Sequence, residues 1–229
     1  MDFANRDVVV TGGTGALGTA VVGALIEGGV HCRVPYVHDG EAKRFPYRDK
    51  VEMVAVKSLA DDADVARLYA DLPKLWASIH IAGGFAAGAV GATDKAALMA
   101  MLDSNLVSCF LCCRAAVKAM AANGGRIVNV VSRQALEWRS GAGLSAYTVS
   151  KAGVAALTTT LAEEVAKDGI LVNAVAPSIM DTPANRAAMP KADFAAWPKV
   201  EEVAATIVFL ASPDNRVTRG GVVPVYGKS

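Results

Sequence analysis

The sequence is most constrained near its start, where a β-branched run passes through a cluster of glycines into a helical pattern. Residues 7–11 (Asp-Val-Val-Val-Thr) have the composition of a buried strand. The residues that follow the glycines are apolar at helical spacing: Leu17, Val21, Leu25 and Ile26. Gly28-Gly29 ends this pattern, as glycines commonly end helices. The sequence therefore predicts a strand, a glycine-rich turn and a helix in direct succession.

The glycine-rich turn has the spacing Gly13-x-Gly15-x-x-Gly18, which dinucleotide-binding turns share. Glycines let the backbone approach a pyrophosphate, and the helix N-terminus supplies N–H donors and partial positive charge. Such turns also serve tight packing alone, but the strand before it and the helix after it favour a nucleotide site. We expect the contacts of the turn to come from Gly12, Thr14, Gly15, Ala16, Leu17 and Gly18.

Strand and helix patterns alternate along the remaining chain, with no linker or repeat between them. Further strands are expected at residues 30–34, 51–56, 78–81, 126–131, 170–175 and 221–226. Further helices are expected from residue 61 or 62 and at about 94–121, 145–167 and 200–210. This alternation predicts one α/β domain over residues 1–229, with a Rossmann-like doubly wound parallel sheet of about seven strands. Ligands of such sheets bind beyond the carboxyl ends of the strands.

Tyr147 and Lys151 lie four residues apart in the helical pattern that begins at Ser145, so they share one helix face. A free tyrosine has a pKa of about 10, which is too high for efficient proton transfer at neutral pH. A nearby ammonium favours the phenolate and lowers that pKa. The pair is therefore a candidate acid/base, although the same spacing is common on solvated helix faces.

Several polar or glycine-rich positions fall at the carboxyl ends of the expected strands. They are the first glycine turn, Ala82-Gly83-Gly84, Ser132 and the loop at residues 177–182. Asn105 lies instead in the middle of an apolar helix, where the presence of a polar side chain calls for a structural or functional explanation. The structural alternatives are a strand-end turn residue for Ser132 and a satisfied core amide for Asn105.

The composition excludes several classes of partner. The chain has 23 basic and 22 acidic residues, which gives no electrostatic reason to expect a nucleic-acid or membrane partner. We find no signal peptide and no apolar stretch near the length of a membrane span, so we expect a cytoplasmic protein. The four cysteines are expected to be buried free thiols and not metal ligands, because the three histidines lie far from them in sequence.

The end of the second strand bears on the choice of cofactor. In doubly wound folds an acid at this position favours NAD over NADP, and here the position is Tyr36. Asp39 and Glu41 are near, but neither is at the position itself. Positive charge for a 2′-phosphate is available from Arg33, His38, Lys43 and Arg44. We therefore expect NADP in preference to NAD.

With these residues assembled, the chain resembles the short-chain dehydrogenase/reductase family over its whole length. Thr11-Gly12-x3-Ala16-x-Gly18 resembles the cofactor loop of the family, and His80-Ile81-Ala82-Gly83 stands where the family usually has Asn-Asn-Ala-Gly. The catalytic tetrad of the family is matched in order by Asn105, Ser132, Tyr147 and Lys151. Its nicotinamide loop, usually Pro-Gly at the start, is matched by Pro177-Ser178-Ile179 and Thr182.

The resemblance implies hydride transfer between a nicotinamide and a small carbonyl or alcohol, with Tyr147 as the proton donor. It implies that Lys151 holds the nicotinamide ribose and lowers the pKa of Tyr147, and that Ser132 bonds the substrate oxygen. It implies that Asn105 bends its helix around a water that relays protons. The cofactor contacts that it implies outside the first turn are Tyr36, Ala82, Gly83, Gly84, Tyr147, Lys151, Pro177, Ile179 and Thr182.

A narrower resemblance concerns the quinonoid dihydropteridine reductases. Residues 181–197 are similar to their substrate loop, residues 82–88 resemble theirs, and the 15-residue step from Ser132 to Tyr147 fits that subgroup. Ser132 itself, which those enzymes generally lack, and Tyr36, where they usually carry an acid, depart from it. We expect a substrate loop at about 178–199, in which Met189, Phe194 and Trp197 either cover the substrate or anchor the loop.

Three functions follow from these patterns. The first is an NAD(P)H-dependent oxidoreductase of carbonyl or hydroxyl compounds, and the second is a reductase of a quinonoid dihydropterin or a similar conjugated imine. The third is a dinucleotide sensor without catalysis, against which the Tyr147–Lys151 pair argues. The helices at 94–121 and 145–167 carry more apolar surface than one sheet face covers. Because relatives usually pair these two helices, we expect a homodimer or a homotetramer.

Overall fold

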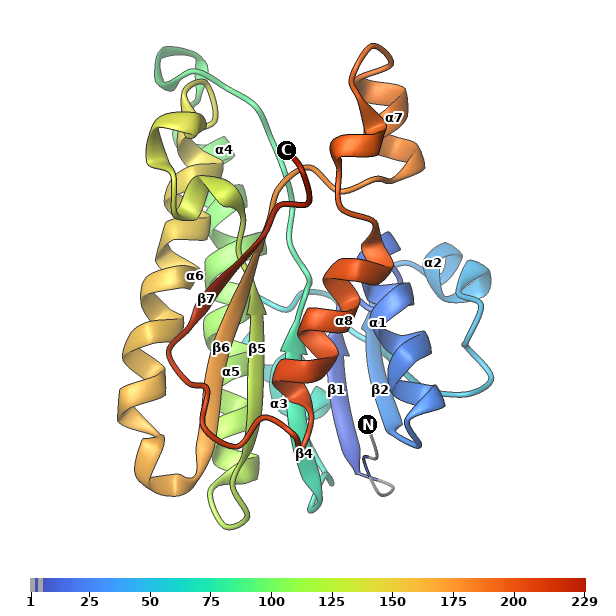
Figure 1. Cartoon of the computed structure of the whole chain (residues 1–229). Coiled ribbons are helices and arrows are strands. Elements are labelled where there is room, and N and C mark those ends of the chain that lie inside the picture. Colours follow the sequence, from blue (N-terminus) through green and yellow to red (C-terminus); the bar gives the residue numbers. More distant parts are fainter. Residues whose placement is uncertain (1–2, 4–5) are drawn as a thin grey trace.

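The computed structural model describes residue 3 and residues 6–229, which form a seven-stranded parallel sheet covered by helices (Figure 1). The strand order is β3-β2-β1-β4-β5-β6-β7, as in a doubly wound sheet. The strands are β1 (Asp7–Thr11), β2 (His31–Tyr36), β3 (Glu52–Ala55), β4 (Leu75–His80), β5 (Gly125–Val130), β6 (Ile170–Pro177) and β7 (Val222–Val225). The predicted α/β class, the parallel pairing and the number of strands are confirmed.

Helices cover both faces of the sheet. The helices α1 (Ala16–Glu27) and α8 (Val200–Ala211) pack against each other and share one apolar core with β1 and β4. A second core on the opposite face joins α3 (Asp62–Leu68), α5 (Ser108–Met120) and α6 (Ser145–Glu164) to the sheet. Successive residues of a strand point to opposite faces, so Val8 and Val10 enter the first core while Val9 enters the second.

Three short helices were not expected from the sequence. They are α2 (Asp39–Arg44) after β2, α4 (Lys95–Leu102) as a separate element, and α7 (Pro183–Ala188) after β6. The last of these begins at Thr182, whose hydroxyl accepts a hydrogen bond from the Asn185 amide, with Pro183 in the first turn. Helices of six to eight residues show too few turns for apolar periodicity to reveal them.

The expected helix at 94–121 is interrupted by a π-helical turn, Asp103–Val107, that separates α4 from α5. The run Lys95–Met120 is nevertheless continuous over 26 residues, with a mean hydropathy of 1.7 in its most apolar window. By length and composition this run is able to cross a membrane, so the expectation that no stretch approaches that length was wrong. The inner face of α5 is packed in the second core, a position in which core helices have the same composition.

The carboxyl ends of the strands lie at one edge of the sheet, which is the upper edge in Figure 1. The strand order reverses between β1 and β4, which creates the crevice where ligands of such sheets bind. The glycine turn after β1, residues 82–84 after β4, Ser132 after β5 and Pro177 at the end of β6 all lie at this edge. The arrangement expected from the sequence is therefore present.

Candidate active site

The glycine turn packs so closely that two of its glycines admit no side chain. Gly12 has φ +68°, and a Cβ on it would lie 2.6 Å from the amide nitrogen of Ala82. A Cβ on Gly18 would lie 2.1 Å from the carbonyl oxygen of Gly12. Gly15 differs, because its Cβ would meet only the Gly12 oxygen, at 3.4 Å. No side chain caps α1, so the first N–H groups of that helix are available to an anion beside the turn.

The second strand ends at Tyr36, as expected, but Arg33 has another role. Its guanidinium bonds the carboxylate of Glu52 at 2.7 Å and donates to the carbonyl oxygens of Leu68 and Ala70. Arg33 and Glu52 are direct partners in the register of β2 and β3, so the prediction that Arg33 contributes to a phosphate site was wrong.

The other cations predicted near the second strand belong to α2 and its start. His38, Lys43 and Arg44 are exposed, and within the described residues none of them forms an ion pair. The guanidinium of Arg44 reaches back toward the start of α2, 3.7 Å from where a Cβ of Gly40 would lie. A positive group therefore stands just beyond the end of β2.

Tyr147, Lys151 and Ser132 meet where α6 passes the ends of β5 and β6. The Lys151 ammonium is buried and donates a hydrogen bond of 2.9 Å to the carbonyl oxygen of Val130, the last residue of β5. The Ser132 hydroxyl is also buried, yet it makes no hydrogen bond of ordinary length within the described part of the chain. Phe85 packs edge-on against the Tyr147 ring with a centroid separation of 5.0 Å.

The electrostatics of this group differ from the expectation. Burial raises the pKa of Tyr147, and the neighbouring Ser132 hydroxyl lowers it in part. Burial also lowers the pKa of Lys151 to about 8, against a smaller opposing effect of Cys109. The expected lowering of the Tyr147 pKa by Lys151 is absent in this structure, because the surroundings withdraw both groups from water.

Asn105 occupies the π-helical turn between α4 and α5, and its amide is hydrogen-bonded. Its Nδ2 donates to the carbonyl oxygen of Gly84 and to the hydroxyl of Ser150, and its Oδ1 accepts from the Gly84 amide. A Cβ on Gly83 would lie 2.4 Å from that Oδ1 and 3.4 Å from the Lys151 nitrogen. Asn105 therefore fixes the turn after β4 against α6, and the helix departs from α geometry at this residue.

The loop after β6 is held by the C-terminal tail. The Ser178 hydroxyl donates to the carbonyl oxygen of Tyr226, and the Ser229 hydroxyl donates to the Ser178 hydroxyl. Pro177 is buried at the strand end, whereas Ile179 is exposed. Thr182 is buried and caps α7, so its hydroxyl already has one partner.

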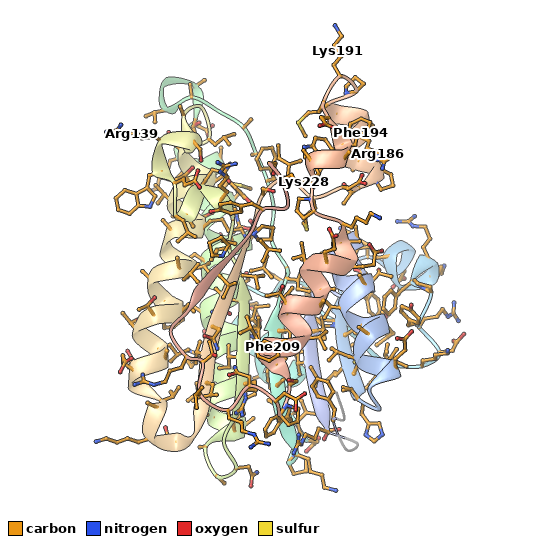
Figure 2. All side chains as sticks on the ribbon, in the orientation of Figure 1. Arg139, Arg186, Lys191, Phe194, Phe209 and Lys228 are labelled. Carbon is orange, nitrogen blue, oxygen red and sulfur yellow. The ribbon has the colours of Figure 1, made fainter. Side chains whose placement is uncertain are left out.

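The segment that follows α7 is anchored by aromatic packing. Trp197 is buried and lies against Phe194, with ring centroids 5.1 Å apart. Arg186 of α7 lies over the Phe194 ring and pairs with Asp181 (Figure 2). Lys228 is close to this segment because its amide donates to the carbonyl oxygen of Ala196. Of the two alternatives for Trp197, covering the substrate or anchoring the loop, the structure favours anchoring.

Two groups at the site were not identified as functional from the sequence. Phe85 lies within residues 82–88, for which the sequence gives a resemblance but no role, and the hydrogen bond from Ser178 to Tyr226 joins positions 48 residues apart. The one local sign in the sequence is an aromatic residue directly after Gly83-Gly84, and the structure shows that this residue is exposed. No local pattern predicts where a C-terminal tail folds back.

Comparisons with known proteins agree with this geometry. Residues 6–193 match the profile of the family described as short chain dehydrogenase. Galactitol 2-dehydrogenase of Rhizobium johnstonii is 34% identical, over 95% of this chain and 92% of that protein. The 2-dehydro-3-deoxy-L-rhamnonate dehydrogenase (NAD(+)) of Sphingomonas sp. is 31% identical, over 98% and 95%. The blue fluorescent protein from a metagenomic library, solved in complex with NADPH, has a TM-score of 0.87 and 26% identity, covering 100% of this chain and 99% of that one.

Proposed function

The chain belongs to the short-chain dehydrogenase family and is an NAD(P)-dependent oxidoreductase, and we propose that it interconverts a small carbonyl compound and its alcohol. One observation carries the proposal: the Ser132 hydroxyl is buried beside the Tyr147 phenol and makes no hydrogen bond of ordinary length within the described residues. A buried polar atom without a partner is costly, and an oxygen of a bound substrate would satisfy it. Both named relatives are dehydrogenases whose names contain hydroxylated compounds, which supports the same substrate class.

The residues have the following roles in this proposal. The nicotinamide cofactor supplies or accepts the hydride when it is bound. Tyr147 transfers the proton at the substrate oxygen, and Ser132 donates a hydrogen bond to that oxygen as negative charge develops. The raised pKa of Tyr147 keeps its phenol protonated at neutral pH, which suits reduction of the carbonyl.

Lys151 and Asn105 act beside the reacting atoms. With a pKa of about 8, Lys151 is mostly an ammonium at neutral pH and suits contact with the hydroxyls of the nicotinamide ribose. Asn105 holds Gly84 against Ser150 and so positions the turn at Gly83 that the cofactor would pass. The remaining cofactor contacts that we propose are Gly12, Thr14, Gly15, Ala16, Leu17, Gly18, Tyr36, Ala82, Pro177, Ile179 and Thr182.

We also propose that NADP is preferred to NAD. Tyr36 leaves the end of β2 without a carboxylate, and Arg44 reaches back toward Gly40 just beyond it. Titration with NADPH and NADH, followed by protein fluorescence, decides the preference. A tenfold tighter binding of NADH would refute it and would point to Asp39 or Glu41 as the ribose contact.

The test of the reaction class is a screen of cofactor oxidation against ketones, quinones and quinonoid dihydropterin. Tyr147→Phe is expected to lower kcat at least about 100-fold while cofactor affinity stays nearly unchanged. Ser132→Ala is expected to cost about 10²–10³-fold in kcat on a ketone, because one of two donors to the developing oxyanion is lost. If Ser132→Ala stays within threefold of wild type on the best substrate, the dihydropterin-type reaction is favoured, since no alkoxide forms there.

For assembly we propose a homodimer or homotetramer that covers the outer faces of α4, α5 and α6. Met99, Phe110 and Val149 are exposed on these helices and fit an apolar contact between copies. Light scattering at micromolar concentration measures the mass, and a monomer would refute the proposal.

A further inference from the structure

A buried cluster of thiols and polar groups lies between the sheet and α5, directly beneath the Lys151 contact. His80 ends β4, Asn129 precedes the Lys151-bound Val130 in β5, and Cys109 and Cys113 lie one turn apart on α5. All four side chains are at least nine-tenths buried. The fold thus brings His80 to two cysteines that lie 29 and 33 residues away in sequence, so the argument that distant histidines exclude a metal site was wrong.

One nitrogen and two sulfur atoms converge on one oxygen in this cluster. The Oδ1 atom of Asn129 lies 2.8 Å from His80 Nδ1, 3.3 Å from the Cys109 sulfur and 3.6 Å from the Cys113 sulfur. The amide group of Asn129 is fixed with Oδ1 toward them, because its Nδ2 donates to the Thr158 hydroxyl at 2.9 Å. Two sulfurs, one imidazole nitrogen and one amide oxygen therefore face one another in the buried interior, and this is a donor set that a metal ion can use.

We propose that Cys109, Cys113, His80 and Asn129 form a binding site for a thiophilic divalent ion, for which Zn²⁺ is the natural choice. The two sulfurs and a nitrogen of His80 lie within 4.8 Å of one another. Zinc takes sulfur ligands at about 2.3 Å and imidazole nitrogen at about 2.0–2.1 Å, which makes the S···N edge of a tetrahedron about 3.5 Å long. The two S···Nδ1 distances are 3.5 Å for Cys113 and 3.9 Å for Cys109.

The charges and protons of this site balance. Binding removes one proton from each of the two thiols, so two thiolates neutralise the dication and no net charge enters the core. His80 then binds the ion through Nδ1 and carries its proton on Nε2. That nitrogen lies 2.8 Å from the Ser78 hydroxyl and 3.3 Å from the Tyr69 hydroxyl, which accept the hydrogen bond. Such an outer partner is what orients a metal-bound histidine.

The experiment uses the full chain, refolded with Zn²⁺ and then desalted, with metal content measured by mass spectrometry. We expect about one zinc ion per chain, about two protons released per ion, and thiolate-to-metal charge-transfer absorption after loading with Co²⁺. Cys113→Ser is expected to lose the ion. The matched control is Cys112→Ser, because Cys112 is the adjacent residue, is equally buried at 1% exposure and lies outside the ligand group.

A second variant, His80→Asn, keeps the test decisive if Cys113→Ser does not fold, and it too is expected to lose the ion. Zinc content far below one per chain in the wild type, or equal retention by His80→Asn and Cys112→Ser, would overturn the proposal. Metal content and the Co²⁺ spectrum are independent of catalysis. These two measurements therefore test the metal site separately from the reaction proposed for Tyr147.

Discussion

The same substitution placed three residues apart in the first glycine turn is expected to have opposite effects on stability. The pair is Gly18→Ser and Gly15→Ser. A Cβ on Gly18 would lie 2.1 Å from the Gly12 oxygen and 2.6 Å from the Gly13 Cα, and both of these atoms are backbone. A Cβ on Gly15 would have one contact, at 3.4 Å, and this residue is the N-cap of α1 with φ −78° and ψ 174°.

The magnitudes follow from these distances. Overpacking against backbone that cannot move aside costs about 1–3 kcal/mol or more, so Gly18→Ser should lower the free energy of unfolding by at least that amount. A serine at position 15 can accept a hydrogen bond from the first turn of α1, which should add about 0.3 kcal/mol relative to glycine. For a chain of this size each kcal/mol moves Tm by about 2–4 °C. We expect Gly18→Ser to melt at least several degrees below wild type and Gly15→Ser to melt at or slightly above it.

Thermal unfolding by circular dichroism, without added cofactor, measures both variants directly. Titration with NADPH then separates folding from binding. Gly15→Ser is expected to fold normally but to bind NADPH more weakly, because the glycine at this position lets the backbone approach the pyrophosphate. The reasoning would be refuted if Gly18→Ser melted within about 1 °C of wild type, or if Gly15→Ser were the less stable of the two.

Three further predictions rest on other contacts. Burial lowers the pKa of Lys151 from 10.5 to about 8, so between these pH values the unfolded chain binds one proton more than the folded chain, and stability rises with pH. Lys151→Met should therefore raise Tm at pH 7, with a gain that shrinks as the pH rises from 8 to 10.5, and a pH series of melting curves checks this. Arg33→Gln should lower Tm without changing the preference between NADPH and NADH, whereas Arg44→Gln should weaken NADPH selectively; fluorescence titration of both variants distinguishes them. Backbone amides of Ser58 and Lys57 hold the pKa of Asp64 below its ordinary 3.8, so the stability that this carboxylate confers should be lost as the pH falls below that value. In Asp64→Ala, Tm should therefore fall less steeply at acidic pH than in the wild type, which melting curves recorded over a pH series measure.

The sequence predicts what depends on neighbours along the chain. The strand, turn and helix at residues 7–27 are each set by local composition, and the Tyr147–Lys151 face follows from helical spacing alone. The prediction for Arg33 is wrong because its partner Glu52 is set by the register of two strands, and no local sequence pattern contains that register.

The same limit explains the π-helical turn and the thiol cluster. The sequence marks Asn105 as a polar residue in an apolar helix, but its bonds to Gly84 and Ser150 come from two other elements. His80 and the cysteines of α5 come together only when α5 packs against β4 in the folded chain. Separation in sequence therefore excludes neither kind of contact.

Buried polar groups that lower the stability of this fold lie at the candidate active site. Withdrawing Lys151 from water lowers its pKa to about 8, which corresponds to a penalty of about 3 kcal/mol at neutral pH. The Ser132 hydroxyl, beside Tyr147, is buried and makes no hydrogen bond of ordinary length in the described residues. The same holds for the Thr148 hydroxyl, which lies against Gly141. Two arginines also have an unpaired nitrogen, but both guanidinium groups lie over the Trp76 ring, which compensates them. Lys151 keeps one hydrogen bond, to the carbonyl oxygen of Val130, and Ser132 has none of ordinary length in the described residues. Natural folds retain such groups mainly where a ligand uses them. A stabilised variant of this protein that keeps its activity should therefore leave Lys151 and Ser132 unchanged.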